Sequence, residues 1–130
     1  MEIDTILIKT ASDLHTLAEK IRFILNIPNT NRKPYPIEQG REACNWGGEY
    51  YIFFTAGIEL RLIQNVEEEF KIEEYSDWQY YLIIDIDFDT KKANDKAAVS
   101  ANRLVLKVIT EYLSEFLGNN GLETKVYIWQ

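Results

Sequence analysis

Cysteine and histidine are almost absent from this chain, which has one of each in 130 residues. A single cysteine, Cys44, excludes a disulfide within the chain, and we expect it to act as a small buried apolar residue. The single histidine, His15, lies four residues before Glu19 on a predicted helix, where an exposed pair of these side chains is expected. Zinc sites usually take several ligands from histidine and cysteine. We therefore expect no metal ion and no other cofactor.

Basic residues are also scarce. The chain has 14 lysines and arginines against 21 aspartates and glutamates, which gives a formal net charge of −7. Proteins that bind nucleic acid need a dense basic surface to neutralise phosphates, and proteins that bind anionic membrane surfaces need basic residues for the same reason. We therefore expect neither nucleic acid nor a membrane as a partner. The acidic residues concentrate between positions 51 and 95, a distribution that would attract a basic protein.

Long apolar runs are missing as well. No uninterrupted apolar segment approaches the roughly 20 residues that a helix needs to cross a bilayer. The first residues, MEIDTILIKT, lack the basic start and apolar stretch of a secretory signal. Together with the single cysteine, these features predict a cytoplasmic protein.

The chain is rich in apolar and aromatic residues, at 46% and 13% of the sequence. Its length predicts one globular domain over residues 1–130, with a core that needs no metal or disulfide. All three prolines and three of the six glycines fall within residues 26–48. We expect this segment to be a long irregular loop, a kind of segment that often carries function.

Hydrophobic spacing predicts the order β-α-β-β-β-α-β. The expected strands are residues 3–9, 49–56, 58–66, 78–88 and 125–129. One expected helix follows Ser12 as its N-cap and ends near Asn26, and the other covers residues 94–117. We expect the long helix to pack on the sheet through an apolar stripe that includes Val105, with Leu82 of the fourth strand buried beneath it. The expected stripe is Ala97, Ala98, Ala101, Leu104, Val105, Val108, Tyr112 and Phe116.

These elements predict an α+β fold: a largely antiparallel five-stranded sheet with two helices packed on one face. Two helices cannot cover both faces of such a sheet, so the other face is expected to stay open unless the 26–48 loop folds over it. Alternation along the strands places aromatic, apolar and charged side chains on that open face, next to Glu59 and Ile63. The interface candidates are Tyr51, Phe53, Arg61, Tyr81, Ile83, Asp85, Asp87, Tyr127 and Trp129.

The string DIDFDT, from Asp85 to Thr90, is the sharpest local motif. On a strand, the carboxylates of Asp85, Asp87 and Asp89 point to one side, and such carboxylates can hold Mg²⁺. A calcium-binding loop is excluded, because its sixth position requires glycine and Thr90 stands there. Two interpretations stay open: a solvated polar face that runs into a turn, or a small metal-dependent hydrolase or nucleotide-handling enzyme that uses these three aspartates.

No motif identifies a catalytic residue, so we favour a non-enzymatic function. We hypothesise that the chain is an acidic protein-interaction module. Through the open aromatic face it would bind either a basic protein partner or a second copy of itself. Tyrosine, tryptophan and arginine dominate binding hot spots, and all three occur among the candidates. The architecture and charge would suit a small bacterial immunity protein or antitoxin, an analogy at the level of fold only.

Overall fold

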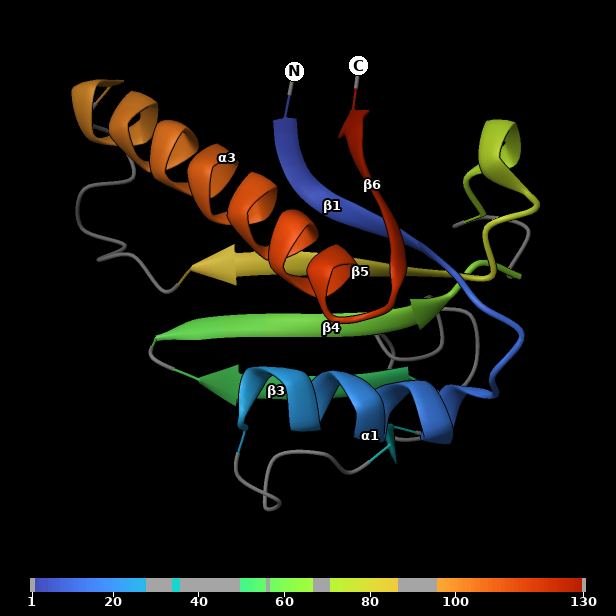
Figure 1. The fold of residues 1–130 in the computed structure, drawn as a ribbon. Coiled ribbons are helices and arrows are strands. Elements are labelled where there is room, and N and C mark those ends of the chain that lie inside the picture. The colour runs from blue at the N-terminus through green and yellow to red at the C-terminus, as the bar shows by residue number, and fades with distance from the viewer. Residues whose placement is uncertain are drawn as a thin grey trace.

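The computed structural model describes residues 2–27, 34–35, 50–55, 57–66, 71–86 and 96–129. An antiparallel sheet in the order β2-β3-β4-β5-β1-β6 runs through it, and the two long helices α1 and α3 lie on the same side of this sheet (Figure 1). The expected α+β fold is confirmed, with a short sixth strand, β2, added at one edge. The elements are β1 (Glu2–Lys9), α1 (Leu14–Leu25), β2 (Pro34–Tyr35), β3 (Tyr50–Thr55), β4 (Ile58–Gln64), the 3₁₀-helix η3 (Glu73–Tyr75), β5 (Tyr80–Ile86), α3 (Lys96–Asn119) and β6 (Glu123–Trp129).

Local signals set the ends of α1, with one correction. Asp13, not Ser12, is the N-cap, because its carboxylate accepts a hydrogen bond from the Thr16 backbone N–H at 2.7 Å. The hydrogen bonds from Thr16 hold the pKa of Asp13 below its ordinary value. The helix ends where Asn26 adopts a left-handed conformation with φ 55°.

The main core lies between the sheet and the two helices. Ile6, Leu62 and Leu82 occupy one row across β1, β4 and β5, and each is completely buried. Leu17 and Ile21 of α1 and Leu117 of α3 complete this core from the helix side. The prediction that Leu82 is buried on the helix side of the sheet is confirmed, and Ile84 of the same strand belongs to this core as well.

Strands β3 and β4 form a tight hairpin. Thr55 pairs with Ile58, and Gly57 has the positive φ of 77° that such a turn requires. Strand β4 ends at Gln64 rather than residue 66, so Asn65 turns into the protein and Val66 is 63% exposed.

Helix α3 packs on the sheet through a different side from the one predicted. Leu106, Ile109 and Leu113 pack against the core, and Thr110 is fully buried with its hydroxyl donating to the Ile3 carbonyl at 3.3 Å. Val105, predicted to be buried, is 44% exposed. Apolar residues surround more than half of this helix, so their spacing alone did not identify the side that faces the sheet.

Candidate functional site

The first two interface candidates lie on the helix-covered face, which corrects the prediction. Tyr51 pairs with Leu62 and Phe53 with Leu60 across β3 and β4, and residues opposite each other in a sheet share a face. Tyr51 is 5% exposed and Phe53 is fully buried. Both registers of β3 are apolar in sequence, so alternation could not assign its faces. These two residues belong to the core.

Tyr51 also receives a contact that the sequence did not predict. Its hydroxyl shares a hydrogen bond with Nδ1 of His15, and the two rings meet edge to face with their centroids 5.5 Å apart. Glu19 forms an ion pair with Arg22 at 2.9 Å. The one histidine of the chain therefore helps to attach α1 to β3.

The other face of the sheet, which we call the second face, is not open at its centre. Ile63 is fully buried there and Tyr81 is 2% exposed, because the segment 71–78 with η3 packs on them through Ile72. This burial raises the pKa of the Tyr81 hydroxyl to about 12. The prediction that Tyr81 belongs to an exposed surface is wrong, because the segment 71–78, most of which lies between two of the expected strands, covers it.

Asn65 holds that cover in place. It is 3% exposed, its Oδ1 accepts a hydrogen bond from the Ile72 backbone N–H at 2.7 Å, and its Nδ2 donates to the carbonyls of Tyr75 and Trp78 at 3.1 and 3.0 Å. One amide side chain thus ties three points of the segment to the end of β4. In the sequence Asn65 looks like an ordinary outward-facing polar residue of a strand.

Tyr127 and Trp129 lie on the second face as predicted, where both are half-buried. The Trp129 indole donates to the Thr5 hydroxyl at 2.8 Å, and the Tyr127 hydroxyl donates to Glu74 at 2.7 Å. The bond to Glu74 raises the pKa of the Tyr127 hydroxyl. Contacts within the chain therefore occupy the polar ends of both side chains.

The remaining candidates on this face are charged or half-buried. Asp85 is exposed and stands opposite Glu59, and Arg61 stands opposite Ile83. Like charges opposite each other destabilise a sheet, and the Arg61 guanidinium offsets this by an ion pair with Glu59 at 2.9 Å. Asp87 and Asp89 lie outside the described residues, as do Cys44 and most of the 26–48 loop. Within the described part of the chain, no group of three potential ligands could hold a metal ion.

We predict that the protein binds no divalent metal ion tightly. Calorimetric titration with Mg²⁺, Mn²⁺, Ca²⁺ and Zn²⁺ should detect no saturable site below the millimolar range, because the aspartate spacing matches no common metal motif. A micromolar site that Asp85→Asn abolishes would contradict this prediction and favour the hydrolase hypothesis.

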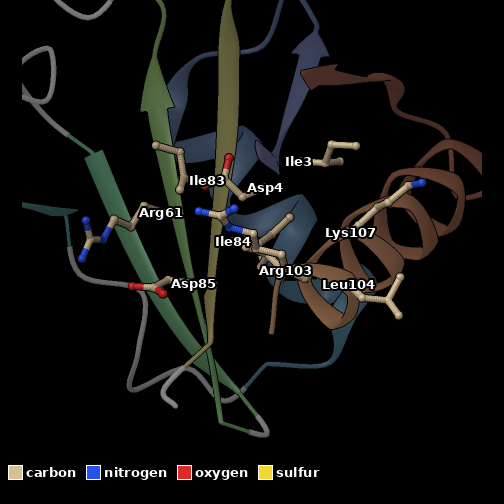
Figure 2. A pocket seen from close by; sticks show the side chains of 10 residues that line it. Ile3, Asp4, Arg61, Ile83, Ile84, Asp85, Arg103, Leu104 and Lys107 are labelled. Carbon is tan, nitrogen blue, oxygen red and sulfur yellow. The ribbon is translucent and has the colours of Figure 1, made fainter. Parts of the chain in front are cut away.

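A pocket of about 470 Å³ lies where β1 separates from β5 (Figure 2). The pairing of these strands covers Thr5 to Ile8, and β1 shifts its register on β6 before Thr5, so β5 continues past the paired region beneath α3. The pocket is lined by Ile3, Asp4, Arg61, Ile83, Ile84, Asp85, Arg103, Leu104, Leu106 and Lys107. The lining carries two carboxylates, which would repel an anion, and three basic groups, which would repel a cation. It therefore favours neither an anionic nor a cationic ligand.

Four of the seven large apolar side chains that are exposed among the described residues lie on α3. Leu104, Val105, Val108 and Tyr112, which we call the α3 stripe, are 62%, 44%, 56% and 64% exposed. Tyr112 stacks on the half-buried Phe116, with ring centroids 6.1 Å apart. These residues belong to the apolar stripe predicted for this helix, but the structure turns the four residues of the α3 stripe toward solvent.

Comparison with protein-family models, with curated proteins and with solved structures finds no match to this chain. In the part of the chain that the structure describes, no helix has the length and apolar character needed to span a membrane.

Proposed function

We propose that this chain is a non-enzymatic protein-interaction module and that the α3 stripe is its contact surface. The observation that carries the proposal is the exposure of four large apolar side chains, 44–64% each, along successive turns of one helix. The opposite side of that helix already packs on the sheet. Monomeric proteins rarely expose contiguous apolar surface of this kind, and where they do it usually marks an interaction site.

The α3 stripe suits this role better than the second face of the sheet. On the second face, Tyr81 is buried, and Tyr127 and Trp129 bond within the chain. Tyr112, by contrast, is 64% exposed and belongs to one of the three residue types that are enriched in binding hot spots. With a net charge of −7, we infer that the partner is a protein rather than nucleic acid or a membrane, and that the module works in the cytoplasm.

The hydrolase hypothesis depends on Asp87 and Asp89, which lie outside the described residues, and on a metal ion. The metal titration above tests it. The interaction hypothesis requires only residues whose positions and exposures the structure gives.

Site-specific photo-crosslinking tests the proposed surface. A photoreactive phenylalanine analogue in place of Val108 should form a covalent adduct with a polypeptide when the variant is expressed in its native cell and irradiated. The same analogue in place of Phe23 is the matched control, because Phe23 is 83% exposed but lies on α1, away from the stripe. We expect adducts from position 108 and few or none from position 23.

Equal adduct yields at both positions, or none at position 108, would overturn the proposal. The adduct can contain a second copy of this chain or another protein, and mass spectrometry of the product separates these outcomes.

A further inference from the structure

The turn between α3 and β6 contains the one asparagine of the chain that is followed by a glycine (Figure 1). The pair is Asn120–Gly121, and both residues are exposed. Glycine has no side chain to shield its backbone nitrogen, so this nitrogen can reach the side-chain amide of the preceding residue more easily than when any other residue follows. Asparagine is also chemically labile. The pair therefore has the local chemistry for deamidation, the spontaneous conversion of asparagine to aspartate.

A regular helix cap closes this turn. The Leu122 backbone N–H donates to the Leu117 carbonyl at 3.2 Å, and the Gly121 backbone N–H donates to the Gly118 carbonyl at 3.2 Å. Gly121 has a φ of 100°, in the left-handed region that favours glycine. Two such hydrogen bonds around a glycine with positive φ form a Schellman motif, which we call the α3 cap. Leu117 and Leu122 both belong to the main core, so the α3 cap is anchored on its inner side.

The α3 cap occupies both groups that deamidation requires. The attacking group would be the backbone nitrogen of Gly121, and its hydrogen is already bonded to the Gly118 carbonyl. The attacked group would be the side-chain amide of Asn120, and its Nδ2 donates to the Phe116 carbonyl at 2.8 Å, back along the helix. Both hydrogen bonds must break before the nitrogen can reach Cγ of Asn120. The closed cap therefore slows deamidation, and an open cap permits it.

We propose that Asn120 is a site of spontaneous deamidation in this protein and that opening of the α3 cap sets the rate of the reaction. Helix ends open locally at a much lower free energy than the core of a protein does. The observed rate is then the intrinsic rate of the Asn–Gly pair multiplied by the fraction of molecules whose cap is open. This modification site is independent of the proposed function, because it requires no partner.

The reaction consumes one water molecule and releases one ammonia molecule. The Gly121 backbone nitrogen loses its proton to hydroxide and forms a bond to Cγ of Asn120. The bond from Cγ to Nδ2 then breaks, and Nδ2 leaves as ammonia after taking a proton from water, which restores the hydroxide. The product is a five-membered cyclic imide. Water opens this ring at either carbonyl and leaves aspartate or isoaspartate at position 120, with no atom oxidised or reduced.

Both products weaken the end of α3. The new carboxylate lies at the C-terminus of a helix, where the helix dipole disfavours negative charge. The donor to the Phe116 carbonyl is lost with the amide. Isoaspartate also lengthens the backbone by one carbon just before Gly121, which disrupts the two hydrogen bonds of the Schellman motif. Deamidation therefore leaves the α3 cap open more often than it is in the original chain.

Peptide mapping by mass spectrometry tests the proposal. The folded chain and the chain in guanidinium chloride are incubated in the same mildly alkaline buffer, and conversion is followed at each asparagine. In guanidinium chloride, Asn120 should convert faster than any other asparagine. In the folded protein it should still convert, but at least about tenfold more slowly, because the closed cap protects it. Asn119 is the internal control: it is exposed in the same turn, but a bulkier residue follows it, so it should stay largely unconverted.

Thr124→Val tests the control by the cap without changing the reactive pair. The Thr124 hydroxyl donates to the Ser114 carbonyl at 2.8 Å and accepts from the Ser114 hydroxyl at 3.2 Å, so it fastens the start of β6 to the end of α3. The variant should convert about fivefold faster than the original chain when folded, because the loss of one hydrogen bond raises the open fraction by about that factor. Thr16→Val, the same change at an exposed position of α1, should leave the rate unchanged.

Three results would overturn the proposal. The first is no conversion of Asn120 in the folded chain over a period in which the chain in guanidinium chloride converts completely. The second is equal rates in the two conditions, which would show that the α3 cap gives no protection. The third is a Thr124→Val protein that is folded by circular dichroism and converts no faster than the original chain. If Thr124→Val does not fold, the first two comparisons still decide the proposal.

Discussion

Leu82→Ala is expected to lower the free energy of unfolding by about 2–5 kcal/mol. Leu82 is fully buried in the central strand β5, between Ile6 of β1 and Leu62 of β4. Truncation removes its buried methyl groups and leaves a cavity that strands on both sides prevent from collapsing. Urea denaturation at neutral pH, followed by circular dichroism, measures the change.

Val105→Ala on α3 is the matched comparison for Leu82. Val105 is 44% exposed, so the same kind of truncation should cost less than about 1 kcal/mol. Similar losses at both positions would show that Val105 is a core residue, and the orientation of α3 described above would be wrong.

Asn65→Ala is expected to destabilise the protein by about 2–4 kcal/mol and to loosen the cover of the second face. The variant removes the acceptor of the buried Ile72 N–H and the donor to the Tyr75 and Trp78 carbonyls. Each buried polar group left without a partner costs about 1–3 kcal/mol, although carbonyls near the surface regain water.

Tyr81 reports this loosening independently of global stability. Burial raises its pKa to about 12, so exposure in the Asn65→Ala protein should return that pKa toward the ordinary value of 10.0. Ultraviolet titration of the folded protein measures the shift, with Tyr81→Phe to identify the signal. Ser76→Ala, an exposed change in the same segment, should alter stability by less than about 0.5 kcal/mol. An unchanged Tyr81 titration in Asn65→Ala would show that Asn65 does not hold the cover.

Periodicity was sufficient where one side of a strand is clearly the more apolar. In β5 every even position is apolar whereas the odd positions include Asp85, and Leu82 faces the helices as expected. The Gly57 turn and the end of α1 at Asn26 were equally predictable, because glycine and asparagine tolerate positive φ. In β3 and α3, where both sides are apolar, the same method failed, and Tyr51, Phe53 and Val105 were placed on the wrong side.

The sequence by itself determined the α+β class, the order of the two long helices and the five longer strands, the two helices on one face of the sheet and the acidic charge. These properties follow from local spacing and composition, which act within a few residues of the chain. Only the tertiary structure decided which side of α3 stays exposed and that the segment 71–78 covers Tyr81. Such choices depend on contacts between distant segments, such as Thr110 with Ile3 and Tyr127 with Glu74, and no local pattern encodes them. The α3 stripe became visible as a surface only once the sheet had taken the other side of its helix.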